Sequence, residues 1–289
     1  MSENSAIEWT THTFNPWQGC VKVSEACRNC YAATLAKRFG VEWGPTARRK
    51  FQSESYWQQP LKWNRQAEKT GTRPRVFCAS MADVFEWLPS HHPDAAQMDA
   101  ERVRLWNLIH ETPALDWLLL TKRPENAKLI AHEDDWPENV WLGTTVENQE
   151  QAEKRIPELL AVNVRVRFLS CEPLLGPVNL RALSGCTDPD CWNGCMPSGI
   201  SWVIAGGESG HGARPTHPAW FRSLRDQCQA AGVPFFFKQW GEFVSVSEVA
   251  GDGPHHSFPD GATVRRVGKK AAGRTLAGRT WDQFPEVAR

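Results

Sequence analysis

Three cysteines near the N-terminus have the spacing of a metal-binding motif. Cys20, Cys27 and Cys30 form the pattern C-x6-C-x2-C, and a helix is expected directly after them, over residues 31–39. Three thiolates on a loop that enters a helix can hold three irons of a 4Fe–4S cluster and leave the fourth iron open to another ligand. Two other interpretations stay open: a zinc site with His12 as an additional ligand, or thiols that only pack in the core.

A second group of cysteines lies in a turn-rich insertion, residues 184–199. Cys186, Cys191 and Cys195 stand there among Asp, Pro and Gly residues, which offer little core to pack into. A second metal, either an auxiliary iron–sulfur cluster or zinc, is therefore favoured over packing. The nine cysteines of the chain are an odd number and too sparse for a secreted disulfide scaffold, so metal binding in a reducing compartment is expected.

Polar residues follow most of the short apolar runs that we expect to form strands. They are Ser80 with Asp83, Lys122 with Arg123, Glu147, Ser170 with Glu172, Gly206-Gly207-Glu208, and Lys238 with Gln239. Glu147 and Glu172 suit ribose hydroxyls, a substrate amine or a proton in transit, and Lys238 is a further candidate beside them. Each carboxylate has the alternative of a salt bridge with Lys122, Arg123 or Lys238. Lys122 and Arg123 suit an anionic group, unless they are only a solvated pair.

The sequence Gly206-Gly207-Glu208 is suited to holding a ligand. Two glycines let a ligand approach the backbone closely, and a carboxylate beside them can accept hydrogen bonds from an ammonium group. Contact with a cofactor, contact with a substrate and a tight structural turn are the three interpretations of this element.

The apolar runs alternate with amphipathic stretches from residue 75 onward. The expected strands are residues 75–80, 117–121, 140–145, 166–171, 202–205 and 235–238, with a possible first strand near 7–14. Helices are expected from Asn148 toward Leu160, from His217-Pro218 to Ala231, and over residues 94–110. Alternating strands and helices predict a parallel sheet with right-handed crossovers. Because the polar residues sit at so many strand ends, an α/β partial TIM-type (βα)6 barrel is favoured over an open doubly wound sheet.

Composition excludes several classes of protein. The chain has 289 residues, 33 Lys and Arg against 33 Asp and Glu, and 41% apolar residues, which excludes a disordered chain and a strongly basic nucleic-acid binder. No apolar run is long enough for a membrane span, and the polar N-terminus is unlike a signal peptide. We expect a soluble, cytoplasmic protein without a membrane partner.

Two regions are expected along the chain. Residues 1–243 form the partial barrel, interrupted by the Cys-rich insertion, and residues 244–289 form a Gly-rich, basic C-terminal extension with Arg265 to Arg279 at its centre. Basic residues here could follow a phosphate backbone, and tryptophans could stack on bases. The alternative is a solvated tail with the tryptophans in the core, since the net charge is zero.

Several segments of the chain together carry a resemblance to a known family. They are Ile7-Glu-Trp-Thr, Phe14-Asn-Pro-Trp-Gln-Gly-Cys20, Cys27-Arg-Asn-Cys30-Tyr-Ala32, Leu120-Thr-Lys-Arg-Pro124, Leu169-Ser-Cys-Glu-Pro-Leu-Leu-Gly-Pro177, Trp202-Val-Ile-Ala-Gly-Gly-Glu-Ser-Gly210 and Phe237-Lys-Gln-Trp-Gly241. Together they resemble a phage-associated three-cysteine protein family, which is similar to a divergent branch of the radical S-adenosylmethionine (radical SAM) superfamily. The resemblance covers nearly the whole chain. The six residues between Cys20 and Cys27 make the first gap of this chain longer than the three-residue gap of the C-x3-C-x2-C motif usual in the superfamily.

The resemblance implies an enzyme that uses the Cys20, Cys27 and Cys30 cluster to cleave S-adenosylmethionine reductively and start radical chemistry. Gly206, Gly207, Glu208, Ser170, Lys122 and Tyr31 are then the expected cofactor contacts, although Tyr31 could equally be a core aromatic. Expected partners are a reductant such as flavodoxin or ferredoxin, a protein encoded next to it, and a nucleotide or nucleic-acid substrate. The rival hypothesis is a zinc-stabilised module that binds nucleic acid or protein without catalysis, and a zinc hydrolase is a weaker third.

Overall fold

The computed structural model describes residues 3–130, 136–185 and 196–286, and its chain divides into two compact units. Unit 1 comprises residues 1–144 and 161–165, and unit 2 comprises residues 145–160 and 166–289. Within the described residues, seven strands form one sheet in the order β1-β4-β5-β6-β7-β8-β9. The expected class, an α/β partial TIM-type barrel with parallel strands, is confirmed.

Unit 1 contains the first strands of this sheet, and their registers are parallel. They are β1 (His12–Thr13), β4 (Arg75–Cys78), β5 (Asp116–Thr121) and β6 (Val140–Thr145), whose last residue begins unit 2. Every residue of β6 is buried, and all but one of β5, as near-continuous apolar runs predict for strands covered on both faces. Two further short strands, β2 (Trp17–Gln18) and β3 (Lys50–Phe51), form an antiparallel pair. Strand β2 comes before Cys20 in the chain, and β3 comes after Cys30.

The described part of unit 1 contains both helices that the sequence predicts for it and three others. They are α1 (Tyr31–Lys37), α2 (Glu54–Trp57), α3 (Gln59–Thr70), α4 (Ala95–His110) and α5 (Ala127–Ile130), with the short 3-10 turns η1 (Glu25–Cys27) and η2 (Pro124–Asn126). The helix expected after Cys30 is thus confirmed, and so is the one expected over residues 94–110. Within the described residues, no helix is both long and apolar enough to cross a membrane.

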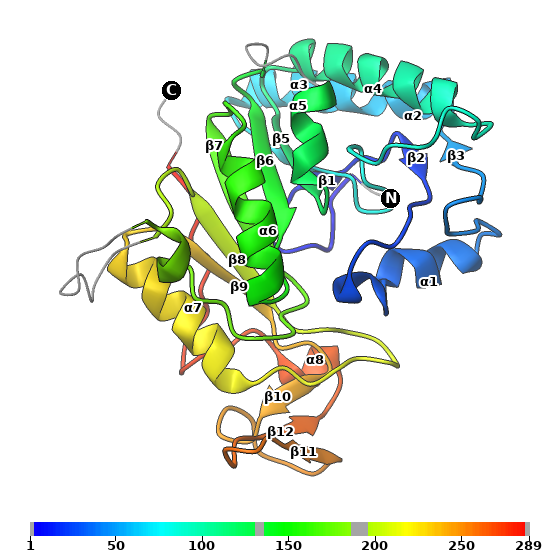
Figure 1. Cartoon of the computed structure of the whole chain (residues 1–289). Helices are drawn as coiled ribbons and strands as arrows, with labels where there is room; N and C mark the ends of the chain where they lie inside the picture. The colour runs from blue at the N-terminus through cyan, green and yellow to red at the C-terminus, as the bar shows by residue number, and fades with distance from the viewer. Residues whose placement is uncertain (1–2, 131–135, 186–195, 287–289) are drawn as a thin grey trace. The chain divides into compact units, whose positions relative to one another are not determined.

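Unit 2 contains β7 (Val166–Cys171), β8 (Trp202–Gly206) and β9 (Phe235–Gln239), which pair in parallel. Helix α6 (Gln149–Leu160) begins where the side chain of Asn148 accepts the Gln151 backbone N–H, as its sequence predicted. Helix α7 (Pro218–Ala230) begins with the expected proline, and His217 caps it through Nδ1. It packs along β8 and β9 (Figure 1).

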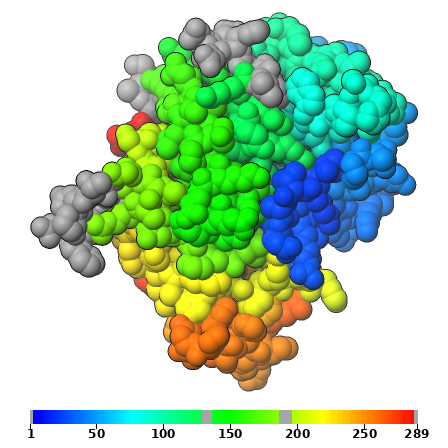
Figure 2. Space-filling view, in the orientation of Figure 1, coloured from blue at the N-terminus to red at the C-terminus, as the bar shows by residue number. Residues whose placement is uncertain are grey.

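The C-terminal residues add a second small sheet to unit 2. Strands β10 (Phe243–Ser245), β11 (His255–Ser257) and β12 (Thr263–Arg266) are antiparallel, and α8 (Lys269–Ala272) follows; Figure 2 shows this sheet in orange at the surface of the unit. The chain then returns to the main sheet, where the Phe237 backbone N–H donates to the Trp281 carbonyl at 2.9 Å. Residues 244–286 therefore pack partly against β9.

Candidate functional site

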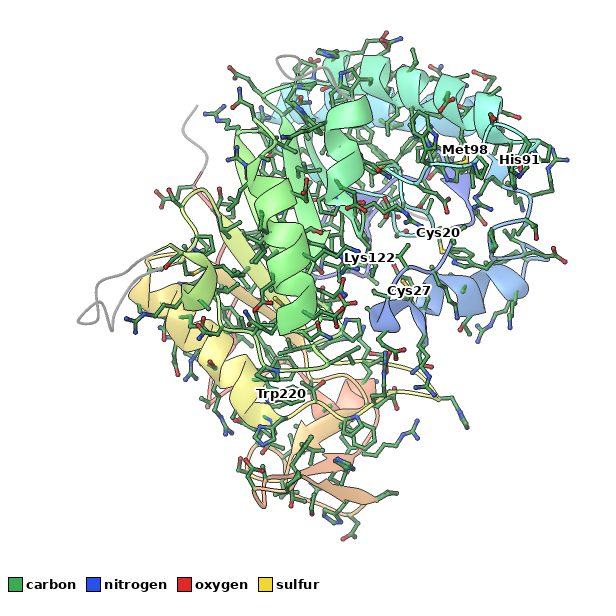
Figure 3. The ribbon with its side chains drawn as sticks, in the orientation of Figure 1. Cys20, Cys27, His91, Met98, Lys122 and Trp220 are labelled. Atoms are coloured by element: carbon green, nitrogen blue, oxygen red, sulfur yellow. The ribbon has the colours of Figure 1, made fainter. Side chains whose placement is uncertain are left out.

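The three N-terminal cysteines occupy one short segment of unit 1. Cys20 follows β2, Cys27 is the last residue of η1, and Cys30 immediately precedes α1. All three are free thiols: Cys27 is buried, and Cys20 and Cys30 are partly exposed. Figure 3 labels Cys20 and Cys27 on this segment. The donor set is therefore three thiols that no disulfide consumes.

The described residues contain no group of three His, Cys, Asp or Glu side chains arranged to hold a single metal ion. His12, the expected extra ligand of a zinc site, stacks on Trp63 with 4.3 Å between ring centroids, and its Nδ1 accepts the Asn4 backbone N–H. The zinc ligands considered from the sequence are thus not gathered. Three thiols that no disulfide consumes are the donor type that a 4Fe–4S cluster takes, with each thiolate binding a different iron.

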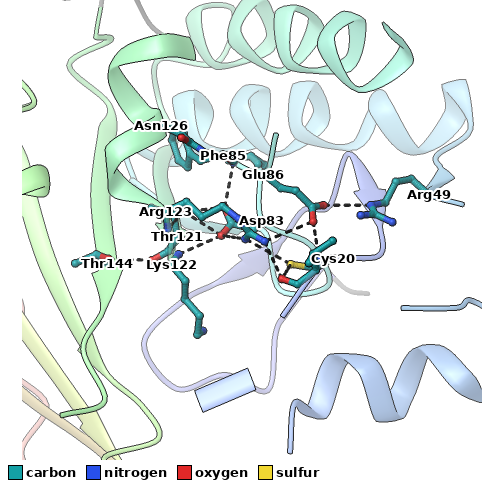
Figure 4. Close-up of polar contacts among 12 residues, drawn as sticks. Cys20, Arg49, Asp83, Phe85, Glu86, Thr121, Lys122, Arg123, Asn126 and Thr144 are labelled. Atoms are coloured by element: carbon teal, nitrogen blue, oxygen red, sulfur yellow. Dashed lines mark hydrogen bonds and ion pairs between the residues drawn. The ribbon is translucent and has the colours of Figure 1, made fainter. Parts of the chain in front are cut away.

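A buried polar network surrounds Cys20 (Figure 4). Arg123, which follows β5, donates through Nη1 to Cys20 Sγ at 3.7 Å and to Asp83 Oδ2 at 2.9 Å. Asp83 also accepts the hydroxyl of Thr121 at 2.8 Å and the backbone N–H of Lys122 at 3.1 Å. Asp83 and Arg123, expected at the strand ends, are thereby brought together around the first cysteine.

Glu86 extends this network to the backbone of the cysteine segment. Its Oε1 accepts the Val21 backbone N–H at 2.6 Å, and its Oε2 accepts Arg49 Nε at 3.1 Å. Burial raises the pKa of Glu86, while Arg49 and Arg123 oppose that shift. Burial also raises the pKa of the Cys20 thiol, Glu86 and Asp83 raise it further, and Arg123 acts in the opposite direction. A metal bound at Cys20 would therefore have to displace a proton that this environment retains.

The other cofactor candidates of unit 1 lie at the surface or at its edge. Tyr31 is 56% exposed and is not a core aromatic; its hydroxyl donates to the Ser80 carbonyl at 2.9 Å. The Lys122 side chain is partly exposed (Figure 3), whereas Arg123 is buried, so these two neighbours are not a solvated pair.

In unit 2, Glu172 and Lys238 form an ion pair at 3.1 Å, with side chains 12% and 19% exposed. The salt bridge considered for Glu172 is confirmed. Gly206 makes room for it, because a Cβ at this position would lie 2.5 Å from Glu172 Oε1. The three residues come from the ends of β7, β8 and β9, as the polar strand ends predicted.

Gly207 and Glu208 make close contacts with other residues of unit 2. A Cβ on Gly207 would lie 1.9 Å from the Trp240 carbonyl oxygen, so the glycine is required by a close approach of two backbone segments. The Glu208 carboxylate accepts Arg214 through its backbone N–H, Nε and Nη2, at 2.8, 2.9 and 2.6 Å. Both features support the interpretation of a tight structural turn.

Glu147 is completely buried and pairs with Arg155 at 2.7 Å. The salt-bridge partners considered from the sequence were Lys122, Arg123 and Lys238, and this prediction is wrong for Glu147. Its partner Arg155 belongs to α6, the helix that begins two residues after Glu147. The Oε1 atom of Glu147 has no hydrogen-bond partner among the described residues. Ser170 is buried in β7, and its carbonyl accepts the Val146 N–H at 2.9 Å.

The remaining cysteines divide into two groups. Cys186, Cys191 and Cys195, the expected second metal site, lie outside the described residues. Cys78, Cys171 and Cys228 are buried free thiols, and burial raises the pKa of each.

Several basic residues of the C-terminal extension interact with other residues of the same chain. Arg265 is buried and donates to the Val249 carbonyl, and Arg274 pairs with Asp282. The guanidinium of Arg279 lies 3.5 Å from the centroid of the Trp281 ring. Among the residues that the structure describes, five tryptophans are fully buried: Trp9, Trp17, Trp117, Trp202 and Trp240. This is the core packing considered as the alternative to base stacking.

Sequence reasoning missed Glu86, Arg49, Arg155 and Arg214. Glu86 had a usable signal, because a lone acid stands within the apolar run Val84-Phe-Glu-Trp-Leu88, where a charge needs a partner. Arg49 had none, since it lies in a polar stretch and reaches Glu86 across 37 residues of sequence.

Comparisons with known proteins identify a family that matches nearly the whole chain. A model of a protein family described as "Protein of unknown function (DUF5131)" matches residues 4–285. No curated protein sequence matches the chain. A solved structure of a spore photoproduct lyase mutant is similar at a TM-score of 0.43 and 10% identity, over 89% of this chain and 68% of that one. A likeness at this level carries no argument about function.

Proposed function

Because the chain belongs to the DUF5131 family of proteins of unknown function, its activity has to be argued from its own residues, and we propose that it is a radical SAM enzyme. In this proposal Cys20, Cys27 and Cys30 hold a 4Fe–4S cluster. The observation that carries it is the cysteine segment: three free thiols lie within one short stretch of unit 1, and a buried arginine donates to the first of them.

When bound, such a cluster supplies one electron and an open iron for S-adenosylmethionine, whose carbon–sulfur bond is cleaved reductively. The residues of this chain have the remaining tasks. Lys122 offers a cation to the carboxylate of the cofactor, and Tyr31, through its exposed ring, offers a stacking surface. Ser170, Gly206, Gly207 and Glu208 lie on unit 2, and this proposal gives them no cofactor contact, because Gly206 makes room for Glu172 and Gly207 and Glu208 belong to a tight structural turn.

Glu172 and Lys238 are the proposed catalytic pair. Their ion pair is only partly exposed, so a proton shared between the carboxylate and the ammonium group is sheltered from bulk water but still reachable. Glu147 stays a proposed catalytic residue of lower rank, because its carboxylate already pairs with Arg155. A reductant of the flavodoxin or ferredoxin type, a protein encoded nearby and a nucleotide or nucleic-acid substrate complete the proposal.

Electron paramagnetic resonance after anaerobic reconstitution with iron and sulfide tests the cluster. We expect the reduced protein to give a 4Fe–4S signal that changes when S-adenosylmethionine is added. The signal should be lost in Cys20→Ala, Cys27→Ala and Cys30→Ala, and should persist in the matched control Cys228→Ala, which removes a buried thiol of unit 2. Stoichiometric zinc and no cluster signal would overturn the proposal and leave the zinc-stabilised binding module in its place.

A further inference from the structure

Arg123 occupies a position from which one side chain reaches both the sulfur and the backbone of the cysteine segment. Its Nη1 donates to Cys20 Sγ at 3.7 Å, and its Nη2 donates to the Val21 carbonyl at 2.7 Å. The guanidinium is buried, and 103 residues of sequence separate it from Cys20. A buried arginine aimed at a thiol sulfur needs an explanation beyond packing, because the sulfur of an unbound thiol is a weak acceptor.

The surrounding acids hold this guanidinium in place. Asp83 accepts Nη1 at 2.9 Å and Glu86 lies 3.6 Å from Nη2. A guanidinium stays protonated in proteins, so Arg123 is a cation beside the sulfur. Glu86 is itself fixed by Arg49, and it accepts the Val21 N–H. The backbone of Val21 is therefore held at both its N–H and its carbonyl.

We propose that Arg123 is a positioning residue that fixes the Cys20 ligand and raises the reduction potential of the cluster through its N–H donation to the sulfur. This inference rests on the proposed function, because it assumes that Cys20 binds iron. Hydrogen bonds to ligand sulfurs and nearby positive charge stabilise the reduced cluster, which carries one more negative charge than the oxidised form. Asp83 and Thr121 then act through Arg123 and not on the cluster directly.

Two measurements on the full chain test the proposal, with Arg123→Gln as the variant and Arg49→Gln as its matched control. Arg49 supports Glu86 but has no contact with Cys20 Sγ among the described residues, so its loss loosens the segment without removing the donor. In the reconstituted protein, a redox titration followed by electron paramagnetic resonance should show that Arg123→Gln disfavours reduction about tenfold, a fall of about 59 mV for a one-electron couple. Arg49→Gln should leave the potential unchanged, and Arg123→Lys, which keeps the charge, should give a smaller fall.

The second measurement needs no cluster. In the unloaded chain, hydrogen–deuterium exchange at residues 19–22 should become at least about tenfold faster in both Arg123→Gln and Arg49→Gln, because each loses one support of Val21. If the cluster forms and Arg123→Gln keeps the wild-type potential, or Arg49→Gln shifts it equally, the proposed role is wrong. If wild type takes up no iron, the proposed function fails instead, and unchanged exchange in Arg123→Gln then overturns the positioning role as well.

Discussion

The acidic side chains around Cys20 in unit 1 and those at the strand ends of unit 2 are neutralised in different ways. In unit 1, Arg123 lies within 4 Å of both Asp83 and Glu86, and Glu86 also binds Arg49, so the acids share their cations. In unit 2, each described acid at a strand end has its own partner; the pairs are Glu147 with Arg155, Glu208 with Arg214 and Glu172 with Lys238. A shared network makes its members interdependent, whereas separate pairs can be changed one at a time.

The largest effect is expected from an isolated buried pair. Arg155→Met leaves the fully buried Glu147 carboxylate without its cation, which costs about 3–5 kcal/mol of unfolding free energy. Urea unfolding measures the change. The matched control is Arg165→Met, which removes an exposed arginine paired with Glu138 and costs about 0–1 kcal/mol. Equal losses in the two variants would show that burial does not distinguish these pairs.

Double-mutant cycles compare the two arrangements directly. Asp83→Asn and Glu86→Gln in unit 1 share Arg123, so we expect a coupling energy of about 0.5–3 kcal/mol in unfolding free energy. Glu147→Gln and Glu208→Gln in unit 2 have no common cation, and their effects should add to within about 0.5 kcal/mol. Additivity in unit 1 would mean that its acids are independent after all.

A third prediction concerns the room that Gly206 leaves for Glu172. Gly206→Ala places a methyl group against the Glu172 carboxylate and pushes it away from Lys238, at a cost of about 1–3 kcal/mol. Thermal unfolding of the variant measures this loss. The double variant Gly206→Ala with Glu172→Ala removes the obstructing carboxylate, and it should be no less stable than Glu172→Ala alone. If it is less stable, the methyl group meets something other than Glu172.

The smallest expected effect is on the pH dependence of the unfolding free energy, to which His12 in unit 1 and Asp260 in unit 2 contribute in different pH ranges. Burial lowers the pKa of His12 in unit 1, although Glu3 acts in the opposite direction. The unfolded chain then takes up this proton first, so stability falls as the pH drops below the usual histidine value of about 6.5. His12→Gln should flatten this part of the stability curve.

In unit 2, the backbone N–H of Ala262 and the side chain of His217 lower the pKa of Asp260. Its contribution is present above the usual aspartate pKa and is lost only at lower pH, below about 3.9. Chemical unfolding measured from pH 8 to about pH 5.5 tests His12 with Asp260 almost fully ionised in both the folded and the unfolded chain. An unchanged slope in His12→Gln would assign the pH dependence to another group.

The fold was largely predictable because its signals are local. Each expected run from residue 75 onward became a strand within one or two residues, since a short, near-continuous apolar segment suits a strand covered on both faces. The helix starts at Asn148 and His217 were equally readable, because a cap and its amide lie within a few residues of one another.

The candidate site was predictable only in part. Cys20, Cys27 and Cys30 lie in one short segment, as their sequence positions require, and the salt bridge considered between Glu172 and Lys238 is present. The partner of Glu147 was wrong because the α6 arginine was not considered. Glu86 was missed although a lone acid in an apolar run signals a need for a partner, and nothing near Arg49 in the sequence indicates that it is this partner.

The amino-acid sequence therefore determined the order of strands and helices along the chain, the helix ends and the placement of three cysteines in one short segment, all of which depend on neighbours within a few residues. The tertiary structure decided which charges meet. Arg123 reaches Cys20 across 103 residues and Arg49 reaches Glu86 across 37, and both contacts exist because the sheet and its loops bring these segments together. The energy of an ion pair depends on the distance between the charged atoms and on their burial, and neither can be calculated from the number of residues between them in the sequence.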